Sequence, residues 1–422
     1  MKHFPTLVLV TIIGLGVEVS SVTSRNGTRA GKLFSIFQVV TFPNAPCVGS
    51  STRNGTCFTS DECSSRGGTS AGICAQGYGV CCTFTVACGA TISQNCTYLV
   101  QEATTNPSTN PCTFTICKQS SDICRIRLDF TTFSIAGPAV GTTSAGDPIP
   151  EGKGGSIGDC NVDSFSVTAP GYKSSPVVCG FNSGQHMILD ASSFCHKATF
   201  DFTGTGSTRQ FDIKVTQYNC GDERGGPKGC LQYFTGASGK VASYNFPTTS
   251  STLSSTVTHL SSQCYTMCFR QELGKCAICF TVVSKGSAAI DQGSFGLSVL
   301  SAPGADVTAL QDSGCTSDYL EIPGSEQDGA PPNAFAVGVT DALGHDRVCG
   351  RFFGYSSVAG LVGAANNDES ICTQQRPFRM IFKTDADEST IGGTMNDVHT
   401  NELAKFPGGI IGFHLHYALQ DC

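Results

Sequence analysis

Apolar and polar residues alternate along many short stretches of the chain, and turns rich in Gly, Ser and Pro separate these stretches. Alternate positions are apolar from Phe211 to Val215, for example, and again from Phe413 to Leu419. An apolar residue at every second position is the pattern of a half-buried β-strand. Long amphipathic helical patterns are hard to find. The pattern therefore predicts an all-β fold built from short strands.

The strand-like stretches occur twice in the same order, and each set has its own cysteines. In both sets a Cys is followed three residues later by Asp, and a Val-Cys-Gly sequence comes after them. The matched positions are Cys112, Cys117, Cys124, Cys160, Asp163, Cys179 and Cys195 in the first set and Cys264, Cys268, Cys276, Cys315, Asp318, Cys349 and Cys372 in the second. The last stretches, 211–220 and 413–422, align without a gap. So many ordered matches predict two copies of one domain, at residues 88–220 and 221–422.

The N-terminus has the pattern of an export signal. A basic start precedes an apolar run from Leu7 to Val19, and small polar residues follow. This pattern predicts a secretory signal peptide over residues 1–20, with a buried N-terminal strand as the alternative. The run is shorter than the ~20 apolar residues that a membrane span needs, and no later stretch is suitable. We therefore expect a secreted, extracellular protein without a membrane span.

The cysteine content agrees with export. The chain has 24 cysteines, and an even count in an exported protein is typical of disulfide bonds. Six lie in residues 47–82 and nine in each repeat. Because nine is odd, complete pairing requires a bridge that joins the repeats or leaves the chain, and we predict that the repeats are covalently tied. The alternative is a zinc site or a redox pair among the cysteines of residues 264–279.

Residues 47–82 form a separate small unit with six cysteines and many glycines. Its 36 residues cannot bury enough apolar surface to fold alone. Disulfides, which contribute ~2–4 kcal/mol each, must supply much of its stability. Cys81 and Cys82 are adjacent, so we expect them to pair with different partners. A zinc site is again the alternative.

Charge and motifs narrow the range of functions. The net charge of −7 argues against general nucleic-acid binding, which needs a basic surface. Glycosylation sequons at Asn26, Asn54 and Asn95 predict a glycoprotein. Residues 312–314 are similar to part of the nucleophile loop of trypsin-like proteases, but the flanking glycines and the segment that carries the catalytic base are missing. We therefore expect no enzymatic activity.

Several segments resemble known families. The second repeat contains Gly239 to Pro247, Cys315 followed by Asp318-Tyr319-Leu320-Glu321-Ile322, then Cys349-Gly350, Phe382, Asp385 and Gly412-Phe413. With these landmarks it resembles CUB domains, which are extracellular β-sandwiches of the jelly-roll type, and the first repeat keeps the middle motif. The six-cysteine unit resembles the clip domains found in front of secreted invertebrate serine proteases. The resemblance implies an all-β chain of two tandem CUB-like β-sandwich (jelly-roll) domains preceded by a small disulfide-rich knot.

The CUB resemblance also implies particular disulfide bonds. The implied pairs are Cys160 with Cys179, Cys315 with Cys349, Cys88 with Cys112 or Cys117, and Cys230 with Cys264 or Cys268. No further pairing follows from the resemblance.

A calcium site is the one cofactor site that the resemblance implies, and no cofactor is otherwise required. Many CUB domains bind calcium through a Glu and two Asp, since this hard cation prefers oxygen ligands. Asp318 and Asp385 fall where two of these ligands would be, but residues 295–300 lack the acidic residue expected on the preceding strand. In the first repeat Asp163 is present and Thr205 replaces the other Asp, so we expect no site there. The alternative is that Asp318 and Asp163 only cap loops or accept hydrogen bonds from backbone amides.

Together these patterns predict a non-catalytic recognition or scaffolding protein that binds an extracellular protein or glycan through loops at the sandwich edges. The loop at residues 323–347 is a candidate contact, with a disordered insert as the alternative. The second prediction is a non-catalytic regulator or cofactor of an extracellular serine-protease cascade. It rests on the clip-like knot, which is followed by no protease domain in this sequence.

Overall fold

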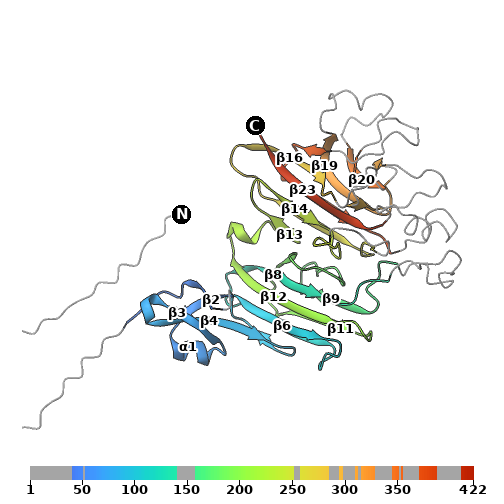
Figure 1. The fold of residues 1–422 in the computed structure, drawn as a ribbon. Helices are drawn as coiled ribbons and strands as arrows, with labels where there is room; N and C mark the ends of the chain where they lie inside the picture. The colour runs from blue at the N-terminus through green and yellow to red at the C-terminus, as the bar shows by residue number, and fades with distance from the viewer. Residues whose placement is uncertain are drawn as a thin grey trace, which may run out of the picture. The chain divides into compact units, whose positions relative to one another are not determined.

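The computed structural model describes residues 40–50, 53–139, 157–250, 257–284, 294–297, 309–311, 315–327, 345–350, 353–354, 370–386 and 410–422. Residues Pro43–Cys422 form one compact unit. The predicted signal peptide and the sequon at Asn26 lie outside the described residues, as does most of the loop at 323–347. The described part is almost entirely β-structure, which confirms the all-β prediction (Figure 1).

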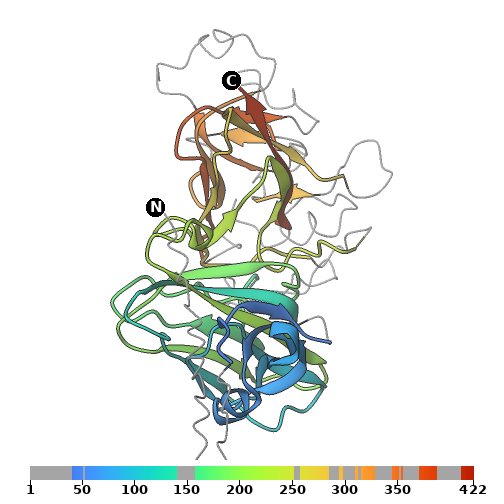
Figure 2. The same ribbon diagram turned by 90° about the vertical axis from the view of Figure 1, so that its left-hand side faces the viewer.

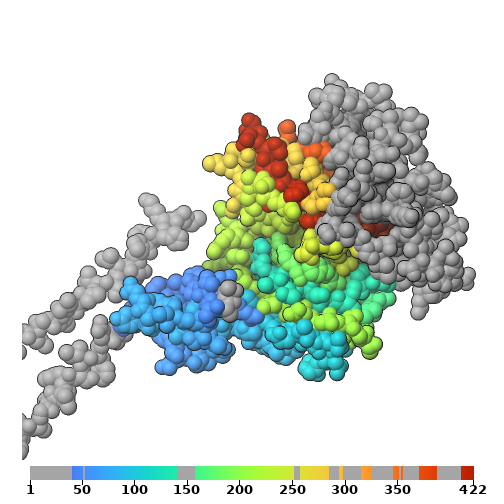
Figure 3. All heavy atoms as spheres, in the orientation of Figure 1, coloured from blue at the N-terminus to red at the C-terminus, as the bar shows by residue number. Residues whose placement is uncertain are grey.

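One sheet joins the six-cysteine knot to the first repeat. Its strands, in spatial order, are β1 (Pro46–Val48), β2 (Asn54–Phe58), β4 (Gly79–Val86), β6 (Thr97–Thr104), β12 (Arg209–Asn219), β8 (Ile123–Ser134) and β10 (His186–Asp190), and β3 (Thr69–Cys74) pairs with β4. Strands β4 and β6 run parallel, with Phe84 opposite Thr97. In the space-filling view, the blue atoms of the knot adjoin the cyan atoms that follow in the first repeat (Figure 3). The knot is therefore an extension of the first repeat's sheet.

The knot contains the one short α-helix of the described residues, α1 (Ser60–Ser65). Thr59 caps it by accepting a hydrogen bond from the Glu62 amide at 3.2 Å, which satisfies one of the free N–H groups of the first turn. Its Cys63 is buried and bonded to Cys82 of β4. A 3₁₀ turn, η1 (Ala75–Gly77), leads into β4.

The second sheet of the first repeat faces the first through a core of phenylalanines. Its strands, in spatial order, are β5 (Thr91–Ile92), β7 (Cys112–Ile116), β11 (His196–Phe202) and β9 (Asp163–Val167). Phe200 of this sheet stacks on Phe211 of β12 with ring centroids 4.0 Å apart, and Phe165 lies 4.4 Å from Phe200. Alternate residues of β12 are buried, as a strand covered on one face requires.

The second repeat follows the turn η2 (Glu223–Gly225). Its strands are hydrogen-bonded into one continuous sheet, which supplies both layers of this repeat. The order of its strands is β13 (Gln232–Phe234), β15 (Cys264–Phe269), β22 (Arg379–Lys383), β19 (Tyr319–Gln327), β21 (Ile371–Thr373), β16 (Lys275–Val282), β23 (Gly412–Asp421) and β14 (Ser238–Ala242), with β17 (Phe295–Gly296), β18 (Ala309–Gln311) and β20 (His345–Gly350) beside this path. Figure 2 shows these strands from a second direction.

Strand β19 connects the two layers of the second repeat. Its first part, residues 319–321, pairs with β22, whereas residues 325–327 pair with β21. Gly324 lies between these parts at φ +62, a left-handed conformation that favours glycine. A strand that bends in this way can leave one layer and enter the other.

Eleven disulfide bonds join 22 of the 24 cysteines. In the knot, the bonds are Cys47–Cys81, Cys57–Cys74 and Cys63–Cys82; in the first repeat, Cys88–Cys112, Cys117–Cys195, Cys124–Cys220 and Cys160–Cys179; in the second, Cys230–Cys268, Cys276–Cys422, Cys279–Cys372 and Cys315–Cys349. The cysteines considered as zinc ligands are thus in disulfides, apart from Cys264.

The predicted covalent tie between the repeats is wrong. The two cysteines without a disulfide partner are Cys96, in the first repeat, and Cys264, in the second. Cys96 is half-buried just before β6, whereas Cys264 is exposed at the start of β15. Each repeat therefore forms its disulfide bonds within itself and keeps one cysteine as a free thiol. This accounts for the odd number of cysteines in each repeat.

Hydrogen bonds connect the two repeats instead. The His186 ring accepts a bond from the Tyr233 amide at 2.8 Å, and the Tyr244 hydroxyl donates to the His186 carbonyl at 2.8 Å. The Arg125 guanidinium of β8 donates to the Cys230 carbonyl at 2.9 Å. Because these groups are buried, each bond also avoids the cost of an unsatisfied polar group.

Candidate calcium site

Asp318 lies immediately before β19 and is 2% exposed. One of its carboxyl oxygens, Oδ1, accepts a hydrogen bond from the Asp385 amide at 2.8 Å. The other, Oδ2, is buried and has no hydrogen-bond partner. A buried polar atom without a partner is costly, so this oxygen is a point where a proton or a cation would stabilise the fold.

The backbone of Asp385 is held on both sides. It follows β22, donates its amide to Asp318, and accepts a hydrogen bond at its carbonyl from the Ser262 amide at 2.5 Å. The structure thus brings together the two residues that the sequence predicted as ligands, although 67 residues separate them.

Burial raises the pKa of the Asp318 carboxyl to about 7, and the negative charge of Asp385 adds to the effect. The charged form is disfavoured because water is excluded, and the hydrogen bond from the Asp385 amide and the charge of nearby Lys383 offset this only in part.

In the first repeat, the aspartate that matches Asp318 is paired with a cationic side chain. Asp163 is completely buried, and Arg209 donates one hydrogen bond of 2.8 Å to each of its carboxyl oxygens. The Ala136 amide donates a further bond to Oδ2 at 2.9 Å. The remaining guanidinium hydrogens reach the Thr105 and Gly204 carbonyls. This pair is fully satisfied, which is the condition for a stable buried ion pair.

The gapless alignment of the last strands places Arg209 opposite Ile411. Ile411 is buried but apolar, so it supplies no charge to Asp318. Thr205, which replaces the second Asp in the first repeat, is exposed. The role of Arg209 was not predicted from the sequence. The place of this arginine two residues before Phe211, the first apolar position of the strand, was a signal for a charged partner of Asp163.

Both interpretations of the two aspartates have support in these contacts. Asp318 and Asp163 each accept a hydrogen bond from a backbone amide, and Asp318 also has the unpaired oxygen that a metal ligand would present. Within the described ranges, no three His, Cys, Asp or Glu side chains gather closely enough to hold a metal ion. Asp318 and the neighbouring Asp385 thus offer two carboxylates, fewer than the Glu and two Asp of the CUB calcium pattern, so backbone oxygens and water would have to supply the other ligands.

The other predicted site residues lie apart from this pair. Asn54 is exposed at the start of β2, whereas Asn95 is half-buried and its amide group is hydrogen-bonded to the backbone of Gln217. Residues 312–314, which were considered for catalysis, fall outside the described residues.

A family model for the animal CUB domain matches residues 227–420. No curated protein matches the chain in sequence. Among solved structures, the CUB1-EGF-CUB2 domains of rat MASP-1 align with 79% of this chain and 99% of theirs, at 11% identity and a TM-score of 0.21. The CUB1-EGF-CUB2 domain of human MASP-1/3 aligns with 75% of this chain and 95% of its own, at 14% identity and a TM-score of 0.19.

A third solved structure, the MASP-1 CUB2 domain bound to Ca²⁺, aligns with 31% of this chain and 98% of its own, at 17% identity and a TM-score of 0.22.

None of the helices in the described ranges has the length and apolarity to cross a membrane. The match over residues 227–420 agrees with the landmarks of the second repeat, and this part of the chain therefore has the sequence pattern of an animal CUB domain.

Proposed function

We propose that this protein is a secreted, non-catalytic recognition protein that binds an extracellular protein or glycan through its two CUB-like repeats, with calcium held by Asp318 and Asp385 of the second. The observation that carries the proposal is the unpaired, buried Oδ2 of Asp318. In the first repeat, Arg209 compensates the charge of the buried aspartate. In the second repeat, an external ion would compensate it.

The disulfides support the extracellular location. Eleven bridges in one chain are typical of an oxidising compartment. The predicted signal peptide at residues 1–20 would direct the chain there.

When bound, calcium would supply a fixed positive charge between the two carboxylates. Asp318 would bind it through Oδ2, and its Oδ1 would continue to hold the Asp385 backbone. This arrangement would hold Asp385, just after β22, next to the start of β19, and it would present a charged edge to a partner. The domain limits of 88–220 and 221–422 belong to the same proposal.

The test combines metal binding with partner capture. Calcium is titrated into the full-length protein by calorimetry, and the immobilised protein is exposed to extracellular fluid with calcium or with a chelator. We expect binding of calcium and capture of partners that the chelator releases. Asp318→Asn should abolish both, while Asp201→Asn, at an exposed position of β11, should change neither. Equal capture by the protein and by Asp318→Asn would refute the calcium-dependent part.

The knot supports the second candidate function, regulation of a protease cascade. Val48, Ile73 and Tyr78 of the knot are 69%, 82% and 61% exposed, and large exposed apolar side chains favour a protein contact. Mixing the purified protein with cascade proteases tests this role. Unchanged protease rates together with a lack of co-purification would eliminate it.

A further inference from the structure

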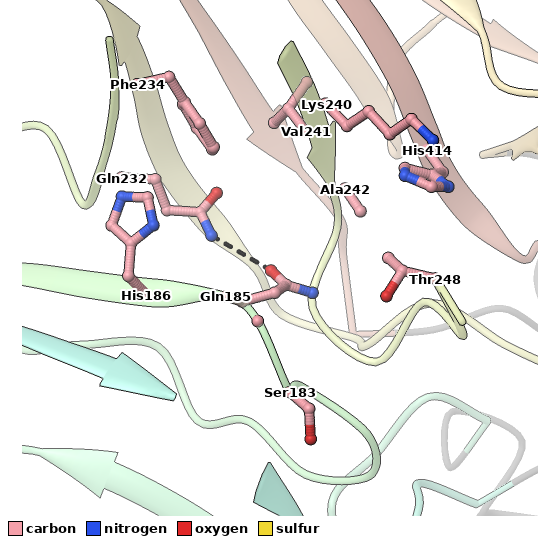
Figure 4. A pocket seen from close by; sticks show the side chains of 11 residues that line it. Ser183, Gln185, His186, Gln232, Phe234, Lys240, Val241, Ala242, Thr248 and His414 are labelled. Carbon is pink, nitrogen blue, oxygen red and sulfur yellow. Dashed lines mark hydrogen bonds between the residues drawn. The ribbon is translucent and has the colours of Figure 1, made fainter. Parts of the chain in front are cut away.

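A cavity of about 250 Å³ lies where the first repeat meets the second, and neither Asp318 nor Asp385 lines it. Residues 183–186, before and within β10, form one wall. The other walls come from β13, β14 and β23 of the second repeat (Figure 4). Its volume is below the ~300–1,000 Å³ of sites for drug-sized ligands, so it suits a group of monosaccharide size.

Two hydrogen-bonded side-chain amides, those of Gln185 and Gln232, lie at the back of the cavity, and their hydrogen bonds fix which atoms are donors and acceptors. The Gln185 amide nitrogen donates to the Ser243 carbonyl at 2.9 Å, so its oxygen must face Gln232. That oxygen accepts a hydrogen bond from the Gln232 amide nitrogen at 3.2 Å. Gln232 Oε1 is therefore turned away from Gln185 toward the space beside Phe234 and Val241 (Figure 4).

Gln232 is 1% exposed, and its Oε1 has no hydrogen-bond partner. The backbone carbonyl of Ser243 prevents the amide from turning over, because a reversed Gln185 would set two oxygens against each other. Gln232 Oε1 is consequently a fixed, buried acceptor in the cavity wall, and only a hydrogen-bond donor can satisfy it.

The opposite side of the cavity is cationic. Lys240 of β14 is exposed, and its side chain extends along the cavity toward His414 (Figure 4). Among the described residues that line the cavity, none is Asp or Glu. An ammonium group without a lining carboxylate attracts an anionic ligand group.

Between these polar ends, Phe234, Val241 and Ala242 supply an apolar wall. A ligand that matches the cavity needs a hydroxyl or amide donor for Gln232, an acid group for Lys240, and C–H groups for the wall. A sugar acid has all three on a compact ring.

We propose that the cavity between the repeats binds the acidic sugar of a glycan, with Gln232 accepting from a sugar hydroxyl and Lys240 binding the carboxylate. This inference rests on the proposed recognition function and narrows it to one ligand class at one site. The site does not include Asp318, so it is expected to work with or without calcium.

The experiment titrates D-glucuronate and N-acetylneuraminate into the full-length protein by calorimetry, in calcium and in chelator. Glucose and N-acetylalanine are the neutral-sugar and peptide-acid comparisons. We expect at least one sugar acid to bind with a Kd of about 1 mM or below. Neither comparison compound should bind as tightly.

Lys240→Gln should weaken sugar-acid binding by about tenfold to a hundredfold, because a charge-assisted hydrogen bond is lost. Its exposed position makes a folding defect easy to exclude by the melting temperature. Lys197→Gln, at an exposed lysine of β11, is the matched control and should bind as the unmodified protein does. Gln232→Met should weaken binding through loss of the acceptor.

Three results would overturn the proposal: lack of binding by both sugar acids, equal affinity of Lys240→Gln and Lys197→Gln, or tighter binding of glucose or N-acetylalanine than of either sugar acid. Each of these leaves the calcium-dependent capture assay unaffected, so the two proposals fail independently.

Discussion

Arg209 donates a hydrogen bond of 2.8 Å to each carboxyl oxygen of Asp163, and the aligned pair in the second repeat is Ile411 and Asp318. The two repeats thus share a buried aspartate but differ in how its charge is compensated. The first carries a built-in cation, whereas the second has an unpaired oxygen and a carboxyl with a raised pKa. This difference leads to the first two predictions.

Replacing Arg209 with Met should destabilise the first repeat by about 3–5 kcal/mol, because a completely buried Asp163 then loses its counter-charge. Denaturant unfolding with the disulfides intact measures the change. Adding Asp163→Asn to Arg209→Met should recover part of the loss, since the isolated charge is removed. An Arg209→Met protein as stable as the original would show that the ion pair contributes nothing.

Calcium should raise the melting temperature at pH 7.5 and have little effect at pH 5. The pKa of Asp318 is about 7 in the fold and about 4 in an unfolded chain. Without metal, the folded state therefore keeps a proton that the unfolded state has lost, and this group's contribution to stability falls as the pH rises from about 4 to about 7. Calcium offsets that loss only where the carboxylate is ionised.

Melting curves with calcium and with chelator at both pH values test this. Asp318→Asn should be insensitive to calcium at either pH, and without metal it should lose less stability between pH 5 and 7.5. A calcium response that persists in Asp318→Asn would place the ion elsewhere.

Acid should weaken the contact between the repeats through His186. Burial lowers the pKa of His186 to about 3, and its ring nitrogen accepts the Tyr233 amide. The unfolded chain takes up a proton near pH 6.5 and the folded state does not, so stability falls as the pH drops from about 6.5 to about 3. His186→Gln keeps an acceptor but cannot titrate, and should lose less stability over this range.

The measurement is the melting temperature between pH 7 and pH 4 in an Asp318→Asn background, where the opposing titration of Asp318 is absent. His259, whose pKa burial lowers to about 4, is common to both proteins. Parallel curves for the two proteins would contradict the role of His186.

Two thiols per chain should titrate in the unfolded, unreduced protein, and one in the native protein. Cys264 is exposed, whereas Cys96 is half-buried and burial raises the pKa of its thiol. Reaction with a disulfide reagent, followed by peptide mapping, identifies each site. Cys264→Ser should remove the native reaction and leave one thiol after unfolding. A bond between Cys96 and Cys264 would appear as complete absence of thiols.

Asn54 should carry a glycan and Asn95 should not. Asn54 is exposed, but the Asn95 side-chain nitrogen donates to the Gln217 carbonyl at 3.2 Å, and its oxygen accepts from the Gln217 amide at 2.9 Å. A glycan on that nitrogen needs open space, which the half-buried Asn95 side chain between the start of β6 and β12 lacks. Enzymatic deglycosylation with peptide mass spectrometry reads each site. Asn54→Gln should lose one glycan, and Asn95→Gln should lose none.

Much of the fold was predictable from local patterns. Alternation in residues 211–220 and 413–422 predicted β12 and β23, and the duplicated cysteines predicted two related units. The merging of the knot with the first repeat was not predictable, because the pairing of β4 with β6 is a backbone contact that leaves no mark on side-chain pattern. The cavity also escaped prediction, since its walls come from both repeats.

The sequence by itself determined strands such as β12 and β23 and the ordered landmarks that recur along the chain, including one aspartate at the matching place in each repeat. These properties depend on local periodicity and on ordered landmarks along the chain. Only the tertiary structure decided that Arg209 neutralises Asp163, that Asp318 lacks such a partner, and that Cys96 and Cys264 keep their thiols. Charge compensation and thiol pairing depend on distances between residues remote in the chain, and those distances exist only after the sheets have packed.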